Sequence, residues 1–223
     1  MGLFSRKPKV QLDAFCRNFF DRNLFNPEIV GGEAGRNYAE TVKRSVSEAD
    51  ATFSQVEYSQ LLAELTLIRF EVFGLAWLHQ FGDKHAATQS AYTKAYLEER
   101  DQANMWDSLM PYNQAIARSS TMGQTSDTSQ GRAYLTFINT MRADLFDAWH
   151  KKGIEADAVA RAANRIATDI SWKKGITPAF VMLTLCERLG CQLNEEGQFR
   201  LIAVIRDLYD RARETMKQVK IDV

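Results

Sequence analysis

The chain has 223 residues, enough to bury one substantial hydrophobic core or two small ones. Hydrophobic residues make up 45% and charged residues 25%, with a formal net charge of zero. These values exclude a disordered or fibrous chain, and the balanced charge is not that of a nucleic-acid-binding domain. The three cysteines, Cys16, Cys186 and Cys191, form no C-x-x-C pair, which argues against a disulfide framework or a zinc knuckle and favours a reducing compartment.

Residues 1–9, MGLFSRKPK, carry basic side chains but no apolar run of secretory length. We expect a flexible basic leader on a cytoplasmic protein; the alternative is a leader that touches an anionic membrane surface. From residue 10 to residue 223, apolar residues recur at helical spacing, and alternating strand patterns are missing. The sequence therefore predicts an all-α fold, a single domain of about eight helices.

In the first half of the chain, the periodicity predicts helices at about 10–25, 33–50, 54–81 and 85–111. Gly82 is the expected stop of the third helix, and Pro111 is expected to kink or end the fourth. The next segment, SSTMGQTSDTSQG at 119–131, is polar and rich in turn-forming residues, so we expect a mobile loop.

Beyond this loop, helices are expected at about 132–152, 155–171, 178–189 and 195–220. Their boundaries follow from capping chemistry. Lysine pairs followed by Gly153 and Gly175 are typical of helix C-termini, as is Gly190. Thr177 is the expected N-cap before Pro178, and Asn194 opens the last helix. The last helix is expected to dock on the bundle through Leu201, Ile205, Leu208 and Met216.

The third predicted helix contains ELTLIRFEVFGLAWLHQFG, which is apolar on nearly every side and is therefore expected to be buried at the centre of the bundle. It is not a membrane span, because Arg69 and Glu71 at its middle would make insertion costly. Glu57, Glu64 and Glu71 are seven residues apart and share one line along it. At least Glu64 and Glu71 should be enclosed.

An enclosed carboxylate needs a partner, and Arg142 lies on the apolar face of the helix expected at 132–152. The simpler hypothesis is a structural ion pair between Arg142 and either Glu64 or Glu71, which fixes the register of two helices. His79 lies over the apolar face of the central helix and is expected to be a hydrogen-bonded core residue.

The alternative is a carboxylate metal site of the ferritin type, which needs Glu-x-x-His on two helices. That motif is missing, and the nearest match, Asp147 with His150, falls on the polar side of its helix. Metal ligands are therefore not predicted. Phosphate-binding loops and the common hydrolase motifs are missing too, so we predict no catalytic residue and no cofactor.

Tyr92, Tyr96 and Trp106 lie in the fourth predicted helix and could line a ligand pocket, although packing is the commoner role of such a stripe. Cys186 is interpreted as a small core residue. Two functions remain open. The first is a non-catalytic helical protein that binds a protein partner or a second copy of itself. The second is a bundle that binds a small apolar ligand or a metal near Glu64, Glu71, His79 and Arg142.

Overall fold

The structure is a computed structural model that describes residues 9–11, 33–81, 99–121, 140, 143–144, 147–148, 151–153, 155–218 and 220–222. The described residues are almost entirely helical, so the predicted all-α class is confirmed for this part of the chain. Its helices are α2 (Glu33–Ala49), the 3-10 helix η1 (Ala51–Gln55), α3 (Tyr58–Phe81), α5 (Glu99–Thr121), α7 (Ala156–Lys173), α8 (Ile176–Leu189) and α9 (Glu195–Lys217). Two three-residue strands, β1 (Lys9–Gln11) and β2 (Lys220–Asp222), pair in parallel.

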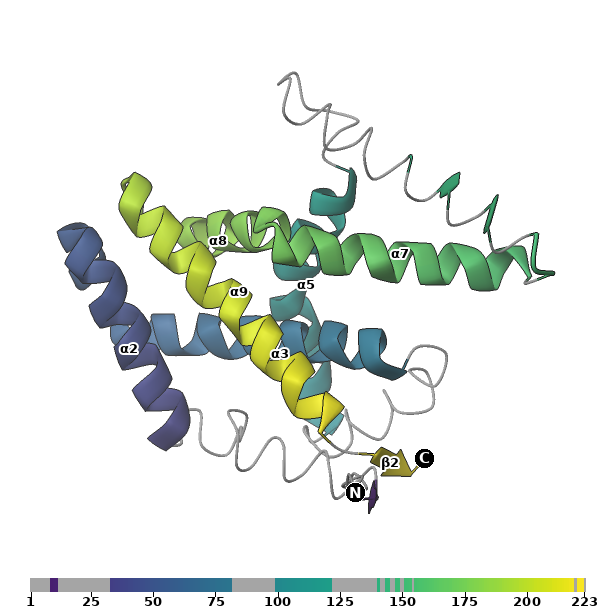
Figure 1. Ribbon diagram of the computed structural model, residues 1–223. Coiled ribbons are helices and arrows are strands. Elements are labelled where there is room, and N and C mark those ends of the chain that lie inside the picture. Colours follow the sequence, from purple (N-terminus) through teal and green to yellow (C-terminus); the bar gives the residue numbers. More distant parts are fainter. Residues whose placement is uncertain are drawn as a thin grey trace, which may run out of the picture.

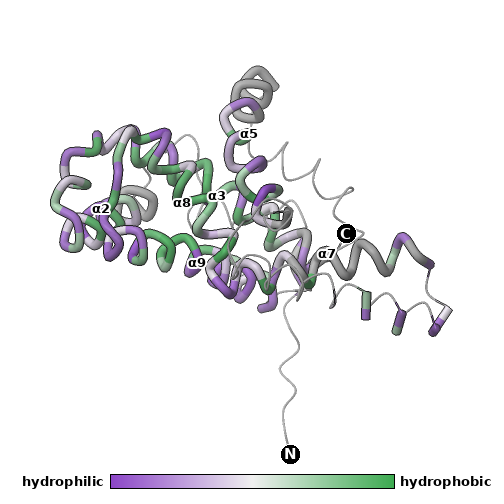
Figure 2. The backbone as a smooth tube through the Cα atoms, turned by 90° about the horizontal axis from the view of Figure 1, so that it is seen from above, coloured by the Kyte–Doolittle hydropathy of each residue, from purple (hydrophilic) through white to green (hydrophobic). Residues whose placement is uncertain are grey.

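Helix α3 contacts each of the other five described α-helices. Figure 1 shows α9 crossing α3 diagonally, with α2 beside it, while α7 and α8 follow one another end to end. In the view from above, hydrophobic residues run along α3 and α8, and much of α2 is hydrophilic (Figure 2). None of the described helices combines the length and apolar character that a bilayer crossing requires.

The burial of α3 follows from its sequence, because apolar residues on every side can be covered only by neighbours on every side. The apolar side chains described as buried in α3 are Leu61, Leu62, Leu65, Ile68, Phe70, Val72, Phe73, Ala76 and Trp77. Arg69 is buried with them, and its guanidinium carbon lies 5.6 Å from the centre of the Tyr38 ring in α2. The predicted docking of α9 is also confirmed, since Leu201, Ile205, Leu208 and Met216 are all buried.

The predicted helix boundaries hold best where capping chemistry is strong. Gly175 and Gly190 adopt φ of 78° and 64°, the left-handed region in which glycine is favoured. Asn194 caps α9, because its side-chain oxygen accepts a hydrogen bond from the backbone N–H of Gly197 at 2.8 Å. Local chemistry alone therefore fixed these ends.

Helix α5 does not end at Pro111, which was one of the two expected outcomes, but continues ten residues past it to Thr121. Proline removes one backbone donor from a helix, but the turn after Pro111 is held by buried side chains, among them Tyr112 and Ala115. Ser119, expected in a mobile loop, is buried in the last part of this helix. Residues 122–131 of that loop lie outside the described residues.

Helix α8 begins at Ile176, so Thr177 lies inside the helix and is not its N-cap. The Thr177 hydroxyl is buried and hydrogen-bonds with the hydroxyls of Ser119 (2.9 Å) and Ser171 (2.7 Å). This oxygen joins three helices instead of capping one. The cause is a tertiary contact, which the local sequence does not reveal.

The chain ends also differ from the prediction. Val10 and Gln11, expected to start a helix, belong to β1, and Lys220, expected in the last helix, pairs with Lys9 in the short parallel ladder. Three residues are too few to show an alternating pattern, so periodicity could not predict this pair. The rest of the helix expected at 10–25, the leader at 1–8 and most of the helix expected at 132–152 lie outside the described residues.

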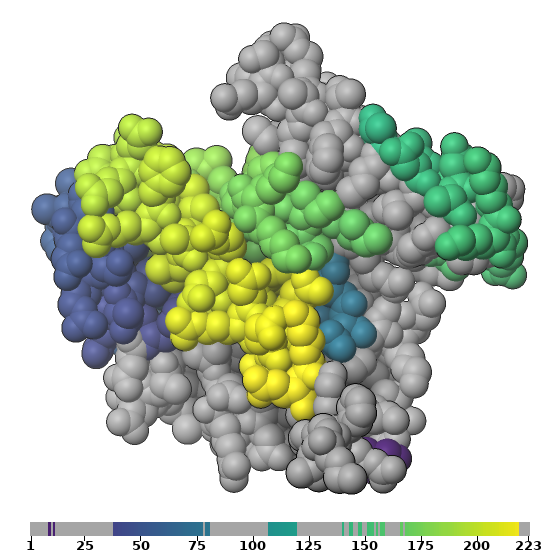
Figure 3. Space-filling model, in the orientation of Figure 1, coloured from purple at the N-terminus to yellow at the C-terminus, as the bar shows by residue number. Residues whose placement is uncertain are grey.

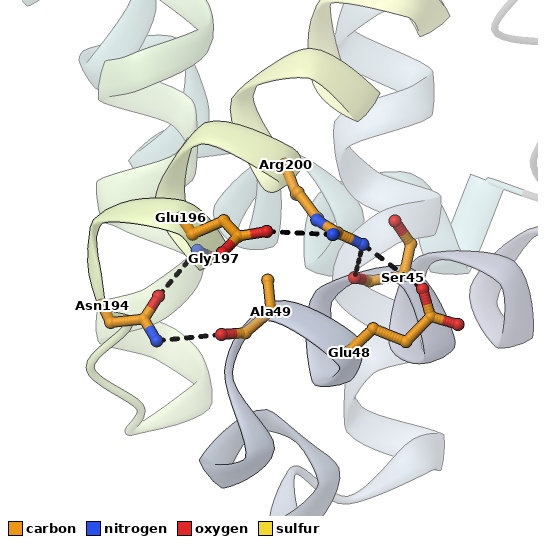
Figure 4. Close-up of polar contacts among 7 residues, drawn as sticks. All are labelled: Ser45, Glu48, Ala49, Asn194, Glu196, Gly197 and Arg200. Atoms are coloured by element: carbon orange, nitrogen blue, oxygen red, sulfur yellow. Dashed lines mark hydrogen bonds and ion pairs between the residues drawn. The ribbon is translucent and has the colours of Figure 1, made fainter.

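A group of polar contacts joins the end of α2 to the start of α9 (Figure 4). Arg200 donates to the carbonyl of Ser45 at 3.1 Å and lies 2.9 Å from the Glu196 carboxylate, while the Asn194 amide donates to the carbonyl of Ala49 at 2.9 Å. Asp50, between α2 and η1, accepts the backbone N–H of Asn194 at 2.6 Å. These bonds hold the two helix ends together. They also provide partners for backbone groups that each helix end would otherwise leave without a hydrogen bond.

Gly197 lies close to Asp50 at this junction, and Gly197→Ala should destabilise the protein by about 1 to 2 kcal/mol. An added Cβ would lie 3.1 Å from the Asp50 Cβ, and Asp50 cannot withdraw without breaking its bond to Asn194. Urea unfolding measures the effect. Helix propensity alone predicts a gain of about 0.5 to 1 kcal/mol from this substitution, and such a gain would contradict the close-approach argument.

Candidate functional site

Three helices bring polar side chains together at Glu64, inside the apolar core. Glu64, in α3, is only 7% exposed. One of its oxygens, Oε2, accepts a hydrogen bond from the Tyr112 hydroxyl of α5 at 2.7 Å and another from Nε of Arg188 in α8 at 2.6 Å. The Arg188 guanidinium carbon lies 5.9 Å from the centre of the Tyr112 ring. The buried carboxylate thus has a neutral donor and an opposite charge.

In the Glu64 cluster, meaning Glu64, Tyr112 and Arg188, the surroundings shift the pKa of both Tyr112 and Arg188. Burial, reinforced by the nearby Glu64 charge, raises the pKa of the Tyr112 hydroxyl, so the hydroxyl remains a donor at neutral pH. The hydrogen bond to Glu64 raises the pKa of Arg188, which remains a cation. Arg188 also lies in the last turn of α8, where a positive charge is favoured by the helix dipole.

A second contact reinforces the same joint between α3 and α8. Gln60 lies one turn before Glu64, and its Nε2 donates to the backbone carbonyl of Arg188 at 2.7 Å. Two side chains of α3 therefore contact the C-terminal end of α8. Glu64 pairs with the Arg188 side chain, and Gln60 donates to a backbone carbonyl that has no partner within the helix. The arrangement fixes the register of α3 and α8.

Glu71 lies two turns after Glu64, about 10 Å further along α3. It is half-buried, and Oε1 accepts a hydrogen bond from Nδ2 of Asn113 at 2.9 Å. Burial raises the pKa of the Glu71 carboxyl from 4.5 to about 7, although the Asn113 hydrogen bond opposes this rise. Glu71 is thus a carboxyl that changes charge near neutral pH.

The Glu71 environment predicts a pH-dependent stability. Because the folded state binds this proton more tightly than the unfolded chain, the free energy of unfolding should fall as pH rises from about 4.5 to about 7. Glu71→Gln keeps an acceptor for Asn113 and removes the charge, so it should stabilise the protein by about 2 to 3 kcal/mol at pH 8 and have little effect at pH 4.5. Urea unfolding at several pH values measures both.

The exposed Glu57, which directly precedes α3, provides the control. Because its side chain is exposed, Glu57→Gln should change the stability at pH 8 far less than Glu71→Gln. If Glu71→Gln shows the same fall in stability between pH 4.5 and 7 as the parent, another group causes it, and the role given to Glu71 is wrong.

The sequence-predicted site residues are only partly brought together. Glu64 is buried, as expected, and its partners among the described residues are Arg188 and Tyr112. Arg142, Tyr92 and Tyr96 lie outside the described residues, as does the side chain of Trp106, so the pair with Arg142 and the aromatic pocket remain predictions.

Arg188 was missed by sequence reasoning, although a signal for it exists. On α8 it falls seven residues after Val181 and three after Leu185, so it shares their buried face. Tyr112 similarly continues the spacing of the buried Leu109 and Ala115 on α5. A charged residue in an apolar stripe near a helix C-terminus is the pattern that indicates such a partner.

His79 is not part of the Glu64 cluster, since fifteen residues of helix put it about 22 Å further along α3. It is half-buried, and its ring meets Tyr209 of α9 edge-on with centroids 6.0 Å apart. Tyr209 in turn stacks on Trp172 of α7 at 4.8 Å. His79 therefore lies in an aromatic contact between helices, consistent with the expected core role.

A further ion-pair group links α7 to α9 near Tyr209. Asp169 pairs with Arg213 and with Lys173, the latter at 2.9 Å. Although burial raises it, the hydrogen bond from Lys173 and the charge of Arg213 hold the pKa of Asp169 below its usual value. Like the Glu64 cluster, this group joins helices with mutually satisfied charges.

The described polar groups give no arrangement typical of catalysis, because the enclosed carboxylate of Glu64 is occupied by internal donors. Among the described residues, no three His, Cys, Asp or Glu side chains gather as a metal site of those ligands would need. Comparisons of the chain with protein families, with curated proteins and with solved structures found no match.

Proposed function

We propose that the chain is a non-catalytic cytoplasmic protein, a bundle of about eight helices around α3, that acts by binding protein through the outer face of α8. The observation that carries the proposal is the apolar character of this face. Leu183 is 56% exposed at its centre, and Phe199 on the neighbouring helix α9 is 65% exposed. Large exposed apolar side chains on adjacent elements are typical of interaction surfaces.

The outer face of α8 lies opposite its buried face, and the apolar residues of this outer face recur at helical spacing. Its apolar members are Ile176, Ala179, Phe180 and Leu183. Helix α9 adjoins the start of this face, because Ile202 lies beside Gly175, and Phe199 is one turn before Ile202. Figure 3 shows α9 at the surface of the face that is drawn, with the end of α7 and the start of α8 next to it. We call these residues of α8 and α9 the outer α8 surface.

The proposed occupant is a second copy of the chain. Two exposed charges of opposite sign flank the outer α8 surface: Glu187 near the end of α8, and Arg206 one turn beyond Ile202, near its start. Neither has an ion-pair partner among the described residues. A two-fold axis through the middle of α8 would place Glu187 of each copy against Arg206 of the other, the self-complementary pattern of an isologous dimer.

Sedimentation equilibrium at pH 7 tests the proposal. The parent should form dimers, and Leu183→Ser with Phe199→Ser should be monomeric and still folded by circular dichroism. Met110→Ser is the matched control, because Met110 is 50% exposed but belongs to α5 and not to the two helices of this surface, so its variant should still dimerise. The proposal is wrong if the parent stays monomeric when its concentration is raised 100-fold. It is also wrong if the double variant still forms dimers.

The other proposal from the sequence, a small apolar ligand or metal near Glu64, Glu71, His79 and Arg142, has less support. Glu64 and Glu71 each bond to a neighbouring side chain, and His79 lies two helical turns or more from both.

A further inference from the structure

Three sulfur atoms converge at the C-terminal end of α8. The Cys186 Sγ lies 3.7 Å from the Sδ of Met182, one turn earlier on the same helix. The Cys191 thiol interacts with the Cys186 thiol. Met182 and Cys186 are buried and Cys191 is half-buried, and both cysteines are free thiols.

The backbone turn after α8 creates this convergence. Gly190, in the left-handed region, reverses the chain, and the N–H of Cys191 bonds to the carbonyl of Cys186 at 3.0 Å. Such a turn ordinarily brings the two side chains at these positions into contact, and usually they are hydrocarbon. Here both positions hold thiols, and a thioether lies within reach of one of them.

We propose that Met182, Cys186 and Cys191 form a binding site for a soft monovalent cation, Cu(I), with two thiolates and one thioether as ligands. This site is distinct from the outer α8 surface and does not depend on the function proposed for it.

The spacing of the sulfurs suits trigonal coordination. With metal–sulfur distances of about 2.3 Å, ligands at 120° lie about 4 Å apart, close to the 3.7 Å between Met182 and Cys186. Cysteine and methionine sulfurs together select Cu(I), whereas zinc sites use Cys, His and carboxylate ligands and take four of them. A set of two thiols and one thioether therefore favours copper over zinc.

Cys191, being partly exposed, is the side from which an ion can reach the buried sulfurs.

The experiment is an anaerobic titration with Cu(I) in competition with bathocuproine disulfonate. All proteins carry Cys16→Ser, so that only the two described thiols remain. One Cu(I) per chain should bind, Cys191→Ala should weaken binding at least 100-fold, and Met182→Leu about tenfold. Met216→Leu, which changes a buried methionine on α9, should have no effect. Copper X-ray absorption should show three sulfur ligands.

Several outcomes would overturn the site. They are an affinity unchanged by Cys191→Ala and a copper centre with nitrogen or oxygen ligands. Equal losses in Met182→Leu and Met216→Leu would also remove Met182 from the ligand set. Cys191 is half-buried at the end of a helix, so Cys191→Ala is expected to fold; circular dichroism of each variant checks this.

Discussion

Ile205→Ala is expected to lower the free energy of unfolding by about 3 to 4 kcal/mol, because Ile205 is fully buried on the face of α9 that packs into the core. The loss combines the transfer free energy of the removed methyl and methylene groups with that of the cavity left behind. Such a loss is a large share of the stability of a typical domain. Urea unfolding followed by circular dichroism measures it.

Phe199→Ala is the matched control for Ile205→Ala, since both change a large apolar residue of α9 to alanine. Phe199 is 65% exposed, so its removal should change stability by less than about 0.5 kcal/mol. If the two substitutions cost the same, α9 does not dock through the face described, and the outer α8 surface would need to be reassigned.

The second large effect is expected at the Glu64 cluster. Arg188→Met should destabilise the protein by about 2 to 3 kcal/mol, because it leaves the Glu64 charge enclosed with only the Tyr112 hydroxyl as a partner. This is less than a fully buried pair would lose, since the Arg188 side chain is 32% exposed and water can partly replace it. Equilibrium unfolding at pH 7 measures the change.

Adding Glu64→Gln to Arg188→Met should recover most of this loss. The amide removes the uncompensated charge and keeps an oxygen that can accept the Tyr112 hydrogen bond. Arg200→Met is the control, because Arg200 pairs with the exposed Glu48 and Glu196 and should cost at most about 1 kcal/mol. Additive losses in the double variant would mean that Glu64 and Arg188 are not energetically coupled.

Much of the fold follows from local patterns in the sequence. The apolar circumference of α3 predicts its burial, and Gly175, Gly190 and Asn194 mark helix ends by their own conformational and capping chemistry. The predictions failed where distant residues decide the local structure. Helix α5 continues past Pro111 because buried side chains stabilise the turns that follow. Thr177 does not cap α8, and its hydroxyl bonds instead to the buried hydroxyls of Ser119 and Ser171.

The candidate site was predictable in kind but not in its partner. An enclosed glutamate requires a cation or a donor, and the sequence alone indicates that Glu64 is enclosed. Which arginine reaches it depends on helix packing, and Arg188 is 124 positions away in the chain. The sulfur group at Met182, Cys186 and Cys191 was overlooked because each residue reads as an ordinary core side chain until the turn at Gly190 is seen.

If the Glu64 cluster is structural and dimerisation uses the outer α8 surface, loss of the cluster should leave dimerisation intact. Sedimentation equilibrium of the Glu64→Gln, Arg188→Met double variant separates the two roles, because this protein has lost the buried charges and kept the surface. We expect a folded protein with the dimerisation constant of the parent. A folded but monomeric double variant would mean that the buried charges are part of the functional site.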